Sequence, residues 1–244
     1  MPNFKHGKVT DILINQYNLT SYFKMARTKG DVDLLDATTF RATAKQFAGG
    51  FFGGDVSLEG LFEAADPLVV GANEVLDAAL GAAVKPVGTI GYSGLDTLGN
   101  VCKLFQGDEQ QHDVNSGVQN LVMTTAQFLA SEGVRQGVVL APIASYSTTA
   151  NGSSVDNATA TTNGAVAHLH VLSKTGTSPT IDWKIQHSTN NSIWVDLFTF
   201  TQATDKTSER LTVTGTINRY LRAIRTIGGS ASPAFDCAVA IARL

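Results

Sequence analysis

Two histidines in the C-terminal third of the chain have the spacing of a metal-binding pair. His168 and His170 alternate with apolar residues, and side chains two apart in a β-strand point to the same face. A metal site needs at least a third ligand, and the neighbouring sequence supplies none. We therefore expect a structural or surface role for both histidines, and we predict no metal and no cofactor.

Other motifs that serve ion binding or catalysis are incomplete in this sequence. Asp31, Asp33 and Asp36 resemble a calcium loop by spacing, but the glycine precedes them and the required Glu is missing. The glycines of residues 88–94 lack the spacing of a phosphate-binding loop, and Ser93 lacks the G-x-S-x-G frame. We therefore predict no catalytic residue and no enzymatic activity.

Aromatic and basic residues near the C-terminus suggest a ligand surface. Trp183 and Trp194 have indole rings that can stack on sugars, so a carbohydrate-binding β-sandwich module is our alternative function. One buried and one exposed tryptophan would fit the same pattern. Arg219, Arg222 and Arg225 form no single stripe, because Arg222 points opposite to the other two in a strand. We expect them to form isolated salt bridges.

The overall charge disfavours a nucleic-acid binder. The 244 residues include 18 basic and 21 acidic side chains, a net charge of −3. Residues 1–145 hold 10 basic and 15 acidic side chains, or −5, and residues 146–244 hold 8 and 6, or +2. No long apolar stretch predicts a membrane span or an export signal. Cys102 and Cys237, far apart in sequence, are expected to be buried free thiols.

Strand patterns dominate the first part of the chain, which we expect to form a β-rich domain over residues 1–145. Alternating apolar residues predict strands at 9–14, 39–47 and 56–62. Residues 24–36 are charged and broken by a glycine, yet they also carry apolar side chains. This composition predicts a long loop that docks on something else.

One helix is predicted at about residues 67–80. Asp66 is a favourable N-cap, Pro67 suits the first helical position, and Gly81 suits the C-terminal end. Its apolar residues recur at helical spacing, so one face should pack against a sheet. A β-sandwich or barrel with one flanking helix follows from this pattern.

The rest of the chain divides into a connector and a second β-rich region. Residues 146–164 are polar and small, which predicts a linker. Residues 165–244 predict a C-terminal antiparallel β-sandwich, or strands that complete the first domain. Its expected strands cover residues 165–171, 181–186, 193–200, 210–214, 220–227 and 235–241.

The strand at residues 56–62 has one apolar and one acidic side. Val56 and Leu58 share the side expected to face the core. Asp55, Glu59 and Glu63 share the other side, which must face solvent, either outside the molecule or inside a channel.

Several short motifs resemble the major tail (tail tube) proteins of long-tailed, non-contractile bacteriophages. They are Leu19-Thr-Ser-Tyr-Phe23, Asp36-Ala-Thr-Thr-Phe40, the run from Phe47 to Phe62 that begins Phe-Ala-Gly-Gly-Phe-Phe-Gly-Gly-Asp, and the helix pattern that follows. Segments near the C-terminus, such as Ile185-Gln-His-Ser188 and Arg219-Tyr-Leu-Arg222, are similar to the ends of such proteins.

The resemblance implies a structural virion protein that self-assembles into stacked rings, the tube through which the genome is ejected. It implies tail tip and tape measure proteins as partners, passage of genomic DNA without specific binding, no membrane partner, and assembly in the bacterial cytoplasm. One tube fold plus a smaller sandwich favours a hexameric ring over a trimer. An acidic lumen would let DNA slide, which makes Asp55, Glu59 and Glu63 lumen-facing candidates. The interface candidates are Lys24, Arg27, Lys29, Asp31, Val32, Asp33, Leu34, Leu35 and Asp36.

Overall fold

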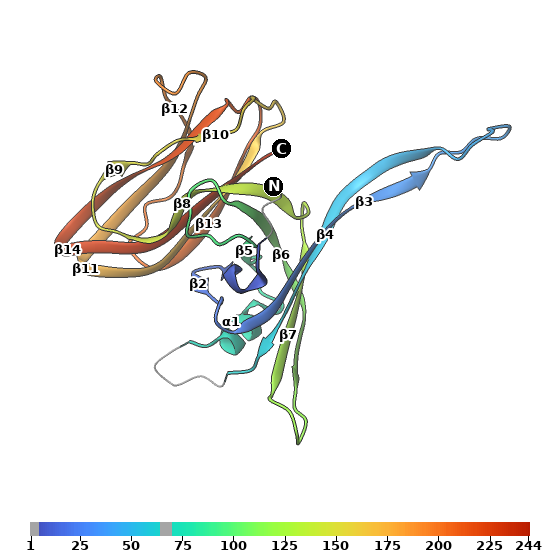
Figure 1. Ribbon diagram of the computed structural model, residues 1–244, viewed down its shortest axis with the longest axis horizontal. Coiled ribbons are helices and arrows are strands. Elements are labelled where there is room, and N and C mark those ends of the chain that lie inside the picture. The colour runs from blue at the N-terminus through green and yellow to red at the C-terminus, as the bar shows by residue number, and fades with distance from the viewer. Residues whose placement is uncertain (1–4, 64–69) are drawn as a thin grey trace. The chain divides into compact units, whose positions relative to one another are not determined.

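The computed structural model describes residues 5–63 and 70–244, and it consists mainly of antiparallel β-strands (Figure 1). The described residues contain one α-helix, α1 (Ala72–Ala79), and a short 3-10 turn at Gly7–Val9. The predicted mainly β fold with a single helix is confirmed. No helix in the described part of the chain has the length and apolar character needed to cross a membrane.

Contacts along the chain define two compact units. Unit 1 comprises residues 1–21, 87–104 and 135–244, and unit 2 comprises residues 22–86 and 105–134. The expected N-terminal domain of residues 1–145 is therefore divided between both units. All of the expected C-terminal domain belongs to unit 1.

Unit 1 is organised around two long strands, β11 (Ala165–Ser188) and β14 (Tyr220–Arg243). These strands pair with each other along their whole length, from Ala165 opposite Arg243 to Ser188 opposite Tyr220. β13 and β12 flank opposite ends of β11, while β8 flanks one end of β14 and the short β9 and β10 flank the other. The further strands of unit 1 are β1 (Asp11–Ile14), β2 (Tyr17–Asn18), β5 (Val87–Gly91), the first residues of β6 (Val101–Asn115), β8 (Arg135–Tyr146), β9 (Ala150–Asn151), β10 (Val155–Asp156), β12 (Val195–Thr199) and β13 (Thr207–Val213).

Each of these long strands was expected as two separate strands. The pairing register shifts between Val171 and Thr180, where Gly176 has a φ of 97° and Ser178 a φ of 46°. Gly229 in β14, with a φ of 114°, lies in the matching irregular stretch. Gly and Pro residues predicted turns at these places, but bulges absorb them and the strands continue.

The paired strands of unit 1 are buried on both faces where residues 165–171 of β11 lie beside residues 237–243 of β14. Alternate residues of β14, such as Val239 and Ile241, join the main core with Trp183. The intervening residues, Ala238 and Ala240, face a second cluster that contains Leu13 and Cys102. Both cysteines are free and buried, as expected.

The polar segment of residues 146–164 belongs to this β-structure. β9 and β10 pair with β14, and the Arg243 guanidinium donates a hydrogen bond to the backbone carbonyl oxygen of Asn157. The segment thus contributes short strands to unit 1. That it joins two separable parts stays a prediction.

Unit 2 is an antiparallel sheet in the order β3, β4, β7 and β6, with α1 alongside. Val56 and Leu58 of β4 are buried, and Asp55, Ser57 and Glu59 are half-buried, so the predicted alternation is present. The helix buries Ala72, Val75, Leu76 and Ala79. The strands are β3 (Phe23–Asp36), β4 (Phe47–Leu61), the part of β6 from Phe105 onward and β7 (Met123–Ala130).

Three expectations about unit 2 require correction. Residues 24–36 form strand β3 rather than a loop, and residues 39–46, expected as a strand, form the irregular connection to β4. Most of β3 is exposed, so no burial-driven alternation marked it as a strand. The helix spans Ala72–Ala79 with Gly71 as its N-cap; the expected cap Asp66 and Pro67 lie outside the described residues.

Candidate assembly surface

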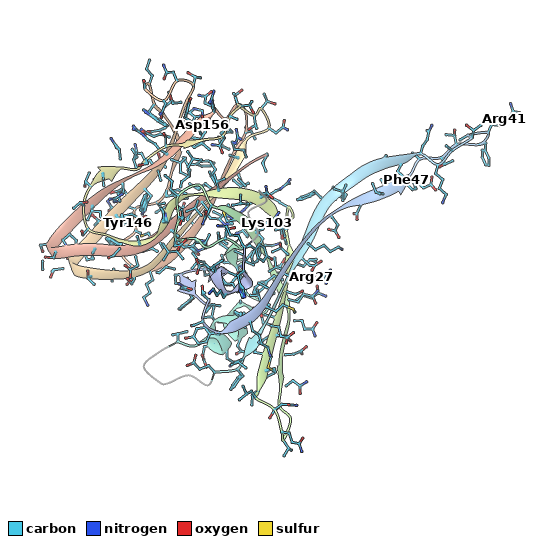
Figure 2. The ribbon with its side chains drawn as sticks, in the orientation of Figure 1. Arg27, Arg41, Phe47, Lys103, Tyr146 and Asp156 are labelled. Carbon is cyan, nitrogen blue, oxygen red and sulfur yellow. The ribbon has the colours of Figure 1, made fainter. Side chains whose placement is uncertain are left out.

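A long β-hairpin carries all of the predicted interface residues, since each of them lies in β3. β3 and β4 pair from Phe23 opposite Gly60 to Asp36 opposite Phe47. β7 pairs with β4 only from Asp55 onward, so β3 and β4 continue beyond the sheet as a two-stranded ribbon (Figure 1). We call residues 30–54 the distal hairpin. Figure 2 shows Arg27 on the hairpin and Phe47 and Arg41 farther along it.

The distal hairpin exposes large apolar side chains. Leu34 is 66% exposed and Phe51 is 86% exposed. An isolated two-stranded hairpin is marginally stable in water, and exposed apolar side chains add a hydration cost that a partner surface would remove. The others in this group are Val32, Leu35, Phe40 and Phe47.

The predicted acidic face of β4 is not uniformly acidic. Lys29 of β3 lies 3.9 Å from Asp55, and Lys24 lies 3.8 Å from Glu59. Lys29 also donates a 2.7 Å hydrogen bond to Asp31, which raises the lysine pKa. These pairs are solvent-exposed and contribute little to stability, but they place lysines beside the carboxylates.

Glu63 lies beyond the end of β4 and does not continue that face. It acts on Tyr22 instead, whose pKa is raised first by burial and then by the Glu63 carboxylate. The structure therefore groups Asp55 and Glu59 across from lysines of β3, and it places Glu63 elsewhere in unit 2.

His168 and His170 form a buried hydrogen-bonded chain, the structural role that the sequence left open. His170 Nδ1 lies 2.6 Å from the Asn15 carbonyl oxygen and must donate to it, so its Nε2 accepts from the Thr89 hydroxyl at 2.9 Å. The Thr89 oxygen in turn accepts from His168 Nδ1 at 3.1 Å. This pattern requires the His170 ring to be neutral, whereas the buried Nε2 of His168 has no hydrogen-bond partner.

Burial keeps these two rings uncharged. Desolvation lowers the pKa of His170 to about 4 and lowers that of His168 well below its ordinary value, with a further contribution from the neighbouring His170. The described residues contain no group of three or more His, Cys, Asp or Glu side chains that could hold a metal ion.

The two tryptophans do not form a common sugar platform. Trp183 is 1% exposed and contacts Tyr146 edge-on, with ring centroids 5.1 Å apart. Trp194 is half-buried and stacks against the Arg222 guanidinium at 4.2 Å. The first is therefore a core residue, and the second already has a partner within unit 1.

The three arginines are bound in different ways. Arg219 makes the expected salt bridge, with Asp156 at 2.6 Å. Arg222 donates to the Gln186 side chain, and Arg225 stacks on Tyr146 and donates to the Thr148 carbonyl oxygen. The expectation of salt bridges is thus wrong for Arg222 and Arg225, because aromatic and neutral acceptors occupy these positions.

Sequence reasoning missed two notable groups. Thr89, which joins the two histidines, lies in the glycine-rich segment that was considered only as a phosphate-binding loop and set aside. Glu109, on β6, is 3% exposed, and no pattern marked it as buried. The apolar residues Phe47 and Phe51 were visible in the sequence, but the interface candidates were taken from residues 24–36 alone.

Comparisons with known proteins give distant similarities only. No protein-family model matches the sequence, and no curated protein matches it. The SPP1 Dit protein (gp 19.1), described as a paradigm of the hub adsorption apparatus of phages that infect Gram-positive bacteria, is 11% identical; the match covers 96% of this chain and 98% of Dit, with a TM-score of 0.40.

Two further similarities cover about half of the chain. The SPP1 tail tube is 8% identical over 54% of this chain and 78% of its own, with a TM-score of 0.42. A chain in the virion of a native gene transfer agent particle is 12% identical over 54% of this chain and 97% of its own, with a TM-score of 0.42. Each of these similarities is distant, with at most 12% identity and a TM-score of at most 0.42.

Proposed function

We propose that this protein is a structural component of a phage tail that self-assembles into stacked rings, hexameric in preference to trimeric, and forms a conduit for DNA ejection. The observation that carries the proposal is the distal hairpin, which projects beyond its sheet and exposes Leu34, Leu35, Phe47 and Phe51. The tail-protein resemblance of the surrounding sequence supports the same function.

A second copy of this chain is the partner that fits the hairpin. A monomer gains no burial for these side chains from its own unit 2, because β7 reaches only as far as Asp55. Docking on a neighbouring copy would bury several large apolar side chains on each subunit. The alternating charges of Lys29, Asp31 and Asp33 would then fix the register of the contact.

The experiment is electron microscopy of the concentrated protein, comparing the wild type with a hairpin variant. We expect rings or tubes from the wild type and monomers from the variant, because the variant removes the apolar contact. Each surface substitution of this kind should change the stability of the monomer by no more than about 0.5 kcal/mol. The variant combines Leu34→Ser, Leu35→Ser, Phe47→Ser and Phe51→Ser.

A matched control tests whether any loss of exposed apolar area has the same effect. Ile193 and Val195 of unit 1 are 72% and 56% exposed. The Ile193→Ser/Val195→Ser variant should assemble like the wild type. Normal tubes from the hairpin variant would overturn the assignment of this interface. Wild-type rings that never stack would indicate a hub rather than a tube.

The conduit requires a wall that DNA does not bind. We propose that the face of β4 with Asp55 and Glu59 lines the lumen, where these carboxylates offset Lys29 and Lys24. Asp55→Lys/Glu59→Lys would leave a surface of lysines repeated around every ring.

Virions that carry this double variant should eject DNA more slowly, and the delay should shrink as salt is added. The control is Asp205→Lys in unit 1, which changes the charge of an exposed residue outside the proposed wall. Assembled tails with unchanged ejection at low salt would show that this face lies outside the conduit.

A further inference from the structure

A buried carboxyl group in unit 2 has no hydrogen-bond partner. Glu109 is 3% exposed, and within the described residues neither Oε1 nor Oε2 forms a hydrogen bond. Ionised carboxylates are almost never buried in this way without a cation or a donor, because the loss of hydration is too costly. This position in the chain therefore favours the protonated acid.

The surroundings of Glu109 are apolar. It lies opposite Phe128 of β7, which is fully buried and contacts the Phe105 ring with centroids 5.6 Å apart. An isolated bridge joins Glu109 to Leu80, the C-cap residue of α1. The nearest helix end is thus a C-terminus, whose partial negative charge offers a carboxylate no stabilisation.

The charged groups of the neighbouring elements do not compensate Glu109. Asp77 of α1 repels an ionised Glu109, and β7 carries no charged residue. Asp108 precedes Glu109 on β6 and points to the opposite face, where it binds Lys85 at 2.9 Å. Lys85 also donates to the Ser131 hydroxyl at 2.6 Å.

We propose that Glu109 is a proton-controlled latch: while its carboxyl group is protonated, α1 stays packed beside β6, and loss of the proton at alkaline pH loosens the helix from the sheet. The buried position and the missing partners carry this inference, which does not depend on the proposed function. Burial, followed by repulsion from Asp77, raises the pKa of Glu109 to about 8, in agreement with the geometry.

The direction of the effect follows from linkage. The folded protein holds the proton of Glu109 more tightly than the unfolded chain, whose glutamates have a pKa of about 4.5. Unit 2 should therefore lose stability as the pH rises from about 4.5 to about 8, and the loss should level off above that range.

The direct test is carboxyl carbon NMR of the full chain with labelled glutamate. The sequence has six glutamates, so the resonances are few, and Glu109→Gln identifies the one in question. We expect one carboxyl group to titrate near pH 8. If every glutamate titrates below about pH 6, the latch does not exist. This readout on the wild type holds even if the variant fails to fold.

Hydrogen exchange of residues 72–80 measures the consequence for the helix. After correction for the intrinsic rate, exchange of this segment should rise about tenfold or more between pH 6 and pH 9 in the wild type, and the rise should be absent in Glu109→Gln. Asp77→Asn should lower the pH at which the rise levels off, because it removes the repulsion that raises the folded pKa of Glu109. Asp113→Asn removes an exposed charge from the same strand and should change nothing. Equal exchange at both pH values in the wild type would overturn the proposal.

Discussion

The two units of this protein differ in where their large apolar side chains lie. In unit 1, His168 and His170 are linked through Thr89 to a backbone carbonyl, and the part of the sheet that carries them is covered on both faces. In unit 2, Glu109 is buried without a partner while Phe51 is 86% exposed. Unit 1 also holds buried polar atoms without a partner, Nε2 of His168 and Nε1 of Trp183, so the difference between the units lies in the exposed apolar side chains of the distal hairpin.

This contrast separates stability from assembly. In a unit with a continuous core, substitutions of buried residues lower the stability strongly, whereas surface substitutions have little effect. In a unit with an exposed apolar hairpin, surface substitutions on that hairpin should have the larger effect on assembly. Both tryptophans belong to unit 1, so their fluorescence reports the unfolding of that unit.

The largest effect is expected from truncation of the unit 1 core. Trp183→Ala would leave a cavity against Tyr146 and should destabilise unit 1 by about 3–5 kcal/mol. Urea unfolding followed by the fluorescence of Trp194 measures the loss. Trp183→Phe, which keeps an aromatic ring, should lose less. A change below about 1 kcal/mol for the alanine variant would contradict the claim that unit 1 is a tightly packed unit.

Acidification should weaken unit 1 through its histidines. The folded pKa of His170 is about 4, below the ordinary value of 6.5, so its contribution to stability is present above pH 6.5 and is lost as the pH falls to about 4. The expected loss is roughly 3 kcal/mol for this ring. Urea unfolding at pH 7 and at pH 4 measures it. Equal stability at both pH values would show that the rings are accessible to protons when folded.

Removal of the hydroxyl that links the histidines should have a smaller effect. Thr89→Val keeps the shape of the side chain but leaves His170 Nε2 without a donor, which should cost about 1–3 kcal/mol. Thermal unfolding at pH 7 compares this variant with Thr89→Ser, which retains the hydroxyl and should recover part of the loss. If Thr89→Val unfolds at the same temperature as the wild type, the hydrogen-bonded chain does not stabilise unit 1.

The smallest structural change is a single cut in the chain. Proteinase K should cleave within residues 146–164, which are polar and largely exposed. Because β8 pairs with β14 across this segment, the two fragments should stay associated on gel filtration. Fragments that separate and remain folded would instead support the boundary between two independent domains that the sequence suggested.

The sequence determined the elements whose signals are local. Alternation of Val56 and Leu58 with Asp55 and Glu59 predicted the inner part of β4, and apolar spacing predicted a helix that the structure has at Ala72–Ala79. The two free buried cysteines also followed from composition and spacing. The strand and the helix depend on residues within a few positions of each other, so they can be predicted from the sequence alone.

Tertiary structure decided everything that depends on distant partners. β3 is a strand because β4 pairs with it, although its own side chains are almost all exposed. β11 and β14 run through Gly and Pro because each is paired along its length with the other. Glu109 is buried, and Thr89 lies between two histidines 79 and 81 residues away, because of how the sheets pack. Such contacts are set by the free energy of the whole fold, and no short stretch of sequence contains them.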